Sequence, residues 1–330
     1  MKMSLSITNV RQAGSIEWDT ILKECDYATF FQSREWAEIW SIYTNRCMQP
    51  DPKMVLFSDG KKVLLPFSSQ KSFKGLIKKY ISSPAGTFGG WLSTDNIKIE
   101  HAVLLVKYIK KRIGNLQWRL NPYDELVFKV QIKNLKNDET HAIKLINGFD
   151  EWAKGHSSAA RKARKACKAG VEIKGASSQE EWREYYEVYE ESLKRWGDKA
   201  SSSYPFELFN TIYNSRSPNI QLWLAFHDNK IVAGALCFYA KKHVVYWHGA
   251  ALSQYFNIRP VNLLMYEIIK NAFEKNYEWY DFNPSGKHQG VKAFKISFGA
   301  EALDSPEVYT ETNCTKLFTK VARVIQRVEL

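Results

Sequence analysis

Short apolar and polar runs alternate along the chain, and two pairs of these runs predict β-hairpins. The first is MVLFSDGKKVLLPF, in which Asp59 and Gly60 separate two apolar stretches. An Asp-Gly pair favours a type I′ turn, because both central residues can adopt a positive φ. The second is LWLAFHDNKIVAGALCFY, which has Asp228 and Asn229 at its turn, and KKHVVYWHGA adds a further strand.

A similar order of elements occurs twice. Each hairpin precedes a glycine-bearing aromatic segment, a helix (AVLLVKYIKKRIG or VNLLMYEIIKNAFEK) with apolar residues at helical spacing, and a short strand. There Trp118-Arg-Leu-Asn121-Pro122 matches Tyr280-Asp-Phe-Asn283-Pro284. The order predicts two similar α/β (α+β) halves, each a mixed, mostly antiparallel sheet flanked by helices. We place the domains at 1–147 and 148–330, with the catalytic groove in the second.

Length and composition exclude several classes of protein. The 330 residues are 45% hydrophobic and 25% charged, which suits about two folded domains rather than a disordered chain. No apolar run approaches the roughly 18 to 20 residues of a spanning helix, and Met1–Val10 lacks the apolar region of a secretory signal. We therefore expect a soluble, cytoplasmic protein. Five scattered cysteines predict reduced thiols and no zinc site.

The net charge of +12 favours polyanionic partners, although it also serves solubility. The densest positive charge lies in EWAKGHSSAARKARKACKAG, which predicts a basic helix from Ser158 to Gly170. Arg161, Arg164 and Lys165 belong to it. Two interpretations stay open: a solvated helix face, or a clamp for a phosphate-rich ligand that approaches over the small residues.

The next predicted helix starts at Ser178 with a capping box to Glu181 and carries an aromatic stripe that we interpret as core. Its exit brings Arg195 and Trp196 together beside Gly197. This pair either holds a substrate at the mouth of a domain interface or is an ordinary helix end.

Several known catalytic motifs are absent, including G-x-G-x-x-G after a strand, G-x-S-x-G and H-E-x-x-H. His248, at a strand end in YWHGA, is a candidate base or a structural hydrogen-bond donor. In AFKISF, the alternation of apolar residues predicts a strand with Lys295 on the face opposite Phe294. Lys295 then either stabilises an oxyanion or phosphate in a cleft, or faces solvent on an edge strand.

Six segments in the same order resemble the FemAB/FemX family of peptidoglycan interpeptide-bridge aminoacyltransferases and their FemAB-like relatives. The resemblance covers roughly residues 28 to 303, and the segments are FFQSREWAEIW, SSPAGTFGGWL, SSAARKARKACKAG, KRWGDK, YWHGA and GVKAFKISFGAE. It implies two tandem GNAT-like domains and acyl transfer, usually of an amino acid from aminoacyl-tRNA to an amine of a cell-wall precursor. The family's Phe-Lys motif matches Phe294 and Lys295, and its lysine is associated with catalysis. The long helical arm of some members has no counterpart here.

The segment Tyr255–Asn262 bears on which acyl donor the protein uses. GNAT enzymes that use CoA bind its pyrophosphate at a glycine-rich helix start, whereas the matching segment here, Tyr255–Asn262, has no glycine, and Pro260 supplies no N–H. We therefore expect aminoacyl-tRNA as the donor co-substrate and no tightly bound cofactor or metal. An acyl-CoA or acyl-carrier donor for surface polysaccharide synthesis is the alternative. A non-enzymatic RNA-binding or envelope-scaffold protein is a third candidate.

In the expected mechanism, Lys295 stabilises the developing negative charge while Asp281 or His248 accepts the proton of the acceptor amine. Candidate contacts to substrate are Arg161, Arg164, Lys165, Arg195, Trp196, Tyr280 and Phe294. The expected partners are aminoacyl-tRNA, a nucleotide- or lipid-linked sugar or peptide acceptor, and peripherally an anionic membrane. We expect a monomer.

Overall fold

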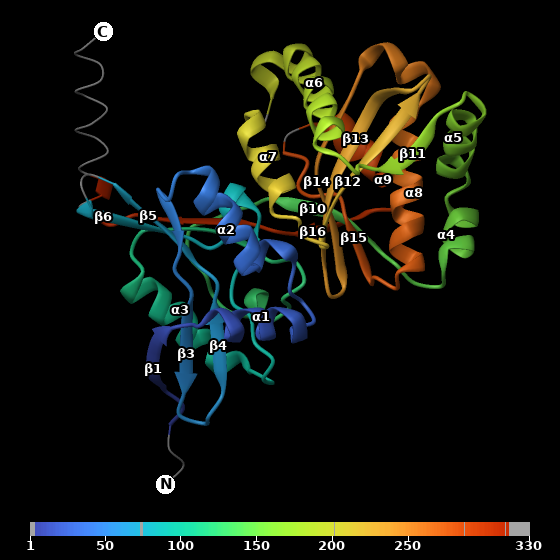
Figure 1. Cartoon of the computed structure of the whole chain (residues 1–330). Coiled ribbons are helices and arrows are strands. Elements are labelled where there is room, and N and C mark those ends of the chain that lie inside the picture. Colours follow the sequence, from blue (N-terminus) through green and yellow to red (C-terminus); the bar gives the residue numbers. More distant parts are fainter. Residues whose placement is uncertain (1–3, 73–74, 201, 287, 314, 317–330) are drawn as a thin grey trace. The chain divides into compact units, whose positions relative to one another are not determined.

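The computed structural model describes residues 4–72, 75–200, 202–286, 288–313 and 315–316, which form two compact units (Figure 1). The first comprises Met1–Asp138 and Asp304–Leu330, and the second Glu139–Leu303. The predicted division into 1–147 and 148–330 differs from these units mainly at the C-terminus. There strand β17 (Glu307–Thr310) pairs antiparallel with β8 (Leu116–Leu120), which returns the C-terminal segment to the first unit.

The first unit contains two sheets. Three antiparallel strands form the smaller one, in the order β1 (Ile7–Gln12), β3 (Lys53–Phe57) and β4 (Lys62–Leu65). The larger one has the order β2 (Met48–Pro50), β5 (Ser68–Ser72), β6 (Ile77–Ile81), β8, β17 and β9 (Leu135–Lys136), and β7 (Phe88–Gly89) pairs with β8. Between residues 4 and 138, this unit has the α-helices α1 (Ser15–Glu24), α2 (Arg34–Tyr43) and α3 (Ile99–Arg112).

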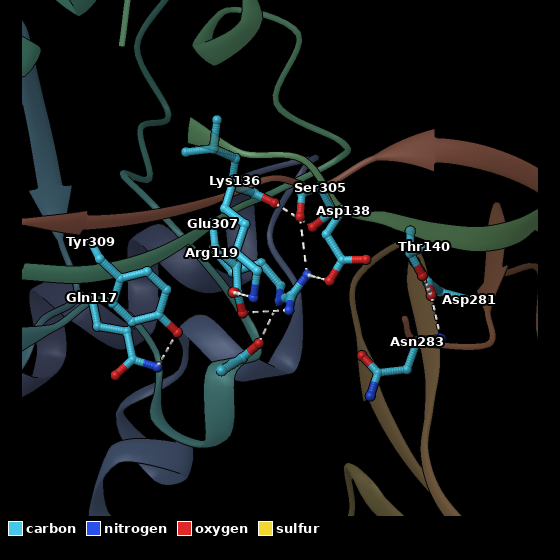
Figure 2. A network of polar contacts seen from close by, with 12 residues as sticks. Gln117, Arg119, Lys136, Asp138, Thr140, Asp281, Asn283, Ser305, Glu307 and Tyr309 are labelled. Carbon is cyan, nitrogen blue, oxygen red and sulfur yellow. Dashed lines mark hydrogen bonds and ion pairs between the residues drawn. The ribbon is translucent and has the colours of Figure 1, made fainter. Parts of the chain in front are cut away.

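A buried arginine fastens the C-terminal segment within the first unit (Figure 2). The Arg119 guanidinium donates to the Asp138 carboxylate (2.8 Å), to the Ser305 carbonyl (3.0 Å) and to the Glu307 carboxylate (2.6 Å). Its side chain is 9% exposed. A buried guanidinium is tolerated where its donors are paired in this way, so the network explains why Ser305 and β17 are held beside β8.

The second unit is built on one seven-stranded sheet, in which β11 to β14 pair antiparallel, β14 pairs parallel with β15, and β15 pairs antiparallel with β10. Its strand order is β11 (Glu172–Gly175), β12 (Ile220–His227), β13 (Lys230–Ala240), β14 (His243–Ala251), β15 (Trp279–Asp281), β10 (Glu139–Lys144) and β16 (Glu301–Asp304). In Figure 1, α4 (Phe149–Gly155), α5 (Ser157–Lys168) and α8 (Pro260–Glu274) cover one face, and α6 (Gln179–Trp196) and α7 (Phe206–Asn214) cover the other.

Both predicted hairpins are confirmed, but the first lacks the expected type I′ turn, because Gly60 has a positive φ and Asp59 does not. The helices predicted from apolar spacing are present as α3, α6 and α8. Asp228 (φ 49°) and Asn229 (φ 60°) form the two-residue turn between β12 and β13, and Gly60 (φ 88°) lies in the turn between β3 and β4. The capping box of α6 is also present, with the Ser178 hydroxyl accepting from the Glu181 amide at 3.2 Å. The mixed, mostly antiparallel α/β architecture with flanking helices is therefore the one that the sequence predicts.

Two local predictions are wrong. The segment around Lys295 is a helix, α9 (Gln289–Ile296), instead of a strand. The rings of Phe294 and Phe298, four residues apart, lie 5.1 Å from each other, which is the i,i+4 contact of a helical turn. Three alternating apolar residues were too few to distinguish the two periods. In addition, the N-cap residue of α5 is His156, two residues before Ser158, where the sequence analysis placed the start of this helix.

Among the described residues, no helix is long and apolar enough to cross a membrane. Within the same ranges, no three side chains of the metal-binding types gather as they would around an ion.

Candidate active site

A cavity of about 670 Å³ opens in the second unit where two parallel strands separate. β14 and β15 pair through His243–Trp279, Val244–Tyr280 and Val245–Asp281, and the register ends there. The next residues of both strands, Tyr246–Gly249 and Phe282–Ser285, line the cavity. The remaining walls come from α6 and the segment after it, from the segment around the start of α8, and from α9. Its size suits a small-molecule ligand or the reactive end of a larger one.

Lys295 lies at this cavity, although its side chain is almost completely buried (3% exposed). Helix α9 carries it, and its Nζ donates to the Asn283 carbonyl in the loop after β15. A buried ammonium group needs such partners, because it loses its hydration. The loop thus fixes the position of one positive charge in the cavity wall.

Asp281 holds this same loop (Figure 2). Its Oδ1 accepts from the Thr140 hydroxyl at 2.5 Å and from the Asn283 amide at 2.6 Å. Asn283 adopts a positive φ of 61°, and the hydrogen bond from its amide to Asp281 supports this turn. Asp281 is completely buried and is not one of the residues lining the cavity, so its geometry is that of a positioning residue rather than of the predicted proton acceptor.

His248 lines the cavity but is poorly suited to the predicted role of base. Burial lowers the pKa of its imidazole to about 3, because the charged form would lose its hydration. Its Nδ1 lies 2.7 Å from the Tyr185 hydroxyl, whose pKa is raised by burial. A base this weak takes almost no proton from an amine near neutral pH, so His248 acts here as a neutral hydrogen-bonding group.

The start of α8 forms another wall of the cavity. Arg259, in the left-handed conformation (φ 60°), caps this helix, and Pro260 occupies its first turn. This is the segment, Tyr255–Asn262, that the sequence analysis compared with the CoA-binding loop. It has no glycine that would let a pyrophosphate approach the backbone closely. Asn262, 9% exposed, adds an uncharged polar side chain.

The other predicted contacts divide into two groups. Trp196 and Phe294 line the cavity. Arg195 lies outside the cavity lining, where its guanidinium donates to the Ala251 carbonyl at 3.1 Å and to Glu191 at 3.3 Å. Tyr280 is also outside it: the ring is completely buried and the hydroxyl donates to the Met265 sulfur, so the structure does not bring this residue to the cavity.

Arg161, Arg164 and Lys165 are exposed on α5 and do not line the cavity. The small residues of this helix, Ala159, Ala163 and Ala166, are buried in the core that α5 shares with α8. The alanines therefore pack α5 against α8 and leave no room for a ligand. This contradicts the part of the clamp hypothesis in which a phosphate-rich ligand approaches over the small residues. The three cations remain candidates for contacts with an extended polyanion.

Sequence reasoning missed much of the cavity wall. Asn283 was noted only as half of a repeated Asn-Pro pair, and Trp247 only as part of YWHGA. Phe256 and Val291, both exposed at the cavity, carried no recognisable signal. An Asn-Pro pair at a strand end, repeated at equivalent places, was the one clue that could have pointed to this loop.

The comparisons with known proteins agree with this geometry. The sequence model of the acetyltransferase (GNAT) domain family matches residues 153–295, which lie within the second unit. No curated protein sequence matches the chain.

Solved structures share the fold of nearly the whole chain. The crystal structure of FemX is similar with a TM-score of 0.72 at 14% identity, covering 94% of this chain and 99% of FemX. The C-terminal domain (DUF2156) of a proposed lysylphosphatidylglycerol synthetase from Agrobacterium fabrum has a TM-score of 0.55 at 11% identity, covering 94% of this chain and 95% of that one. L-PGS from Bacillus licheniformis has a TM-score of 0.51 at 13% identity, with coverage of 82% and 87%.

The fold, the matched domain and the cavity define the class of protein. The chain is an acyltransferase of the GNAT fold, built from two tandem GNAT-like units. The predicted resemblance to FemAB-like proteins is confirmed by the similarity of its fold to that of FemX.

Proposed function

We propose that the protein transfers an aminoacyl group from aminoacyl-tRNA to an amine of a cell-wall or envelope precursor. One observation carries the proposal: Lys295 is fixed at a cavity that opens between the separated strands of the GNAT domain. The fold similarity to FemX supports the same reading. The net charge of +12 suits a nucleic-acid donor and a phosphate-bearing acceptor, and it also suits peripheral contact with an anionic membrane.

The reaction is an aminolysis of an ester. The acceptor nitrogen attacks the acyl carbonyl carbon, a C–N bond forms, and the C–O bond to the donor ribose breaks. The amine loses one proton, and the released ribose oxygen gains one. Lys295 stabilises the negative charge that develops on the carbonyl oxygen or on the leaving oxygen, and a positioned donor of this kind contributes about 3 to 4 kcal/mol to the transition state.

An acyl-CoA donor is the second candidate, and one observation favours it. The start of α8 lines the cavity, and a helix N-terminus attracts the phosphates of such a donor. The absence of glycine from that segment and Pro260 in its first turn weigh against it, because fewer N–H groups can face a pyrophosphate.

The donor is tested by supplying one amine acceptor with either charged tRNA or acyl-CoA and following which is consumed. We use a UDP-linked muramyl peptide as the acceptor, with tRNA carrying radiolabelled alanine or with labelled acetyl-CoA. Label should pass from the tRNA to the peptide. Transfer from acetyl-CoA alone would contradict the proposed donor.

The partner surface is tested by its salt dependence. Binding of charged tRNA should weaken steeply with salt, and replacing Arg161, Arg164 and Lys165 together with alanine should make that dependence shallower, by roughly one unit of slope for each lost phosphate contact. An unchanged slope would remove these residues from the proposed interface.

A further inference from the structure

Helix α3 of the first unit presents lysines on its outer side. Its inner side packs in the hydrophobic core of that unit through Ala102, Leu105 and Ile109. Lys107, Lys110 and Lys111 are exposed, and their spacing of three and four residues brings them to one side of the second half of the helix. The helix is therefore amphipathic, with three positive charges in solvent.

The hairpin of β5 and β6 lies beside this half of α3. The pKa of Tyr108, on α3, is raised by burial and by the neighbouring Tyr80 of β6, so these two side chains are close. Lys78 lies two residues before Tyr80 on the same side of β6, and Lys71 of β5 is its direct partner across the strand pair. The lysine surface, as we call this region, thus consists of Lys71, Lys78, Lys107, Lys110 and Lys111.

Few carboxylates offset the charge of the lysine surface. Asp51 pairs with Lys78 at 2.6 Å, but it also pairs with Lys53 at 2.5 Å, so one carboxylate serves two lysines. Within the part of the chain that the structure describes, no carboxylate lies within 4.0 Å of the other four lysines. The neighbouring segments add two exposed acidic residues, Glu100 in the first turn of α3 and Glu311 after β17. Positive charge therefore predominates.

Exposed apolar side chains border the lysines. Leu76, at the turn of the hairpin, is 77% exposed and lies two residues before Lys78. Val103, four residues before Lys107 on the same side of α3, is 36% exposed. Exposed apolar residues next to lysines are typical of surfaces that bind at a membrane interface, where the charges meet lipid headgroups and the apolar groups enter the acyl boundary.

An RNA-binding surface has a different composition. Nucleic acids are bound preferentially by arginine, which pairs with phosphates through two parallel hydrogen bonds, and by aromatic rings on which bases stack. Here lysines predominate, and the Lys78 ammonium lies over the ring of Tyr80, 4.7 Å from its centre. Leu76 and Val103 offer no hydrogen bond to a base or a phosphate. The composition therefore favours a lipid partner.

We infer that the lysine surface docks the first unit on anionic lipid membranes, with the lysines at the headgroup phosphates and Leu76 in the interface. An anionic partner also relieves the repulsion between Lys71 and Lys78, which lie directly opposite each other. The inference goes beyond the proposed function, because binding to vesicles needs neither a donor nor an acceptor. It assigns membrane contact to particular residues instead of to the overall charge.

Co-sedimentation with lipid vesicles tests the partner directly. The full chain is mixed with vesicles of phosphatidylcholine alone, or of phosphatidylcholine and phosphatidylglycerol in a ratio of roughly three to one. Binding to the anionic vesicles should be at least roughly 100-fold tighter than binding to the neutral ones, and it should weaken as salt is added.

Two variants test the surface itself. Lys107→Gln, Lys110→Gln and Lys111→Gln together remove three charges with little change in helix propensity. This triple variant should bind anionic vesicles roughly 100-fold more weakly, because each lysine near an anionic membrane contributes roughly fivefold. Leu76→Ser should weaken binding by roughly tenfold, since the leucine side chain leaves water in the bound state.

The matched control is the triple change Arg161→Gln, Arg164→Gln and Lys165→Gln on α5. It removes the same number of charges from exposed residues of the second unit, so vesicle binding should stay within about twofold of the wild type. Circular dichroism establishes that each variant is folded before its binding is compared.

Each outcome bears on the inference. Equal binding of the wild type to neutral and anionic vesicles would overturn it. An equal loss in the α5 variant would show that overall charge, and not the lysine surface, binds the membrane. Unchanged binding of Leu76→Ser would contradict the role of the apolar group.

RNA is the competing partner. If the triple variant of α3 lost binding to tRNA but kept its binding to vesicles, the lysine surface would be an RNA site and the inference would be wrong. The donor experiment is separate, because it uses a soluble acceptor. Its failure would contradict the proposed function and leave the membrane surface standing.

Discussion

The two units differ at the end of their parallel strand pairs, β7–β8 in the first unit and β14–β15 in the second. In each, a helix connects strands that become parallel neighbours: α3 before β8 in the first unit, and α8 before β15 in the second. In the first unit, β6 pairs with the start of β8, and β7 then pairs with its end through Phe88–Arg119 and Gly89–Leu120. In the second, the pairing ends at Val245–Asp281 and the cavity begins.

The repeated Asn-Pro pair shows the consequence. Asn121 is buried in the first unit, where its side chain donates to the Tyr27 carbonyl at 2.7 Å and accepts from the Tyr123 amide at 3.1 Å. Asn283 lines the cavity of the second unit, and its carbonyl accepts from Lys295. Two units with a similar order of elements thus end differently at this point. In the first unit β7 pairs with the end of β8, whereas in the second the strands separate and the cavity opens between them.

The largest expected effect is on turnover, from Lys295→Ala. Because it removes the charge that stabilises the transition state, kcat should fall by roughly 100- to 1,000-fold, while binding of a stable donor analogue changes by less than about tenfold. Single-turnover transfer and calorimetry measure the two. Lys292→Ala is the control: its ammonium pairs with Glu139 at 2.5 Å and it does not line the cavity. Equal losses in both variants would contradict the assignment.

Asp124, which follows β8 in the first unit, should make the free energy of unfolding depend on pH. Burial raises the pKa of Asp124 to about 7 from an ordinary value of 3.8, so the folded protein binds more protons than the unfolded chain between these values. Stability should therefore fall as pH rises from about 4 to 7.

Asp124→Asn removes this dependence and keeps an acceptor for the Leu126 amide. At pH 8 the variant should be more stable than the wild type by about 2 to 4 kcal/mol, and at pH 4 nearly equal to it. Urea unfolding at both pH values measures the difference. A gain that is the same at pH 4 and pH 8 would show that the charge of Asp124 is not its cause.

A smaller effect should come from disturbing β7. A β-carbon on Gly89 would lie 2.7 Å from the Ser82 β-carbon and 3.0 Å from its carbonyl carbon, so Gly89→Ala must displace the strand that closes the first unit. Overpacking of this kind costs about 1 to 3 kcal/mol of unfolding free energy. Gly290→Ala, which would meet no atom within 4 Å on α9, should cost nothing. Equal stability of both variants would contradict the tight closure of the first unit.

The sequence predicted what short-range chemistry determines. Turn residues with positive φ located both hairpins, and apolar spacing located the helices and, with them, the repeat. Lys295 was singled out from the polar segment around AFKISF, the family resemblance added the Phe294–Lys295 pair, and the structure brings both residues to the cavity.

Long-range pairing accounts for what the sequence left out. Nothing local to Glu307–Thr310 shows that it pairs with β8, about 190 residues earlier in the chain, and nothing in Phe88-Gly89 shows that it closes a gap. Tyr280 illustrates the same limit, since its burial depends on α8 packing against β15. The strand assigned to Lys295 failed for a local reason, because three alternating positions also fit one helical turn.

Photolabelling tests most directly whether the open strand end of the second unit holds the donor. A 3′-aminoacylamido adenosine with a diazirine on its acyl group is irradiated with the protein, and the labelled peptides are mapped by mass spectrometry. Labels that the unmodified analogue competes away should fall in residues 246–249 and 282–295. Competed labels at residues 119–124 of the first unit, or on α5, would contradict the account.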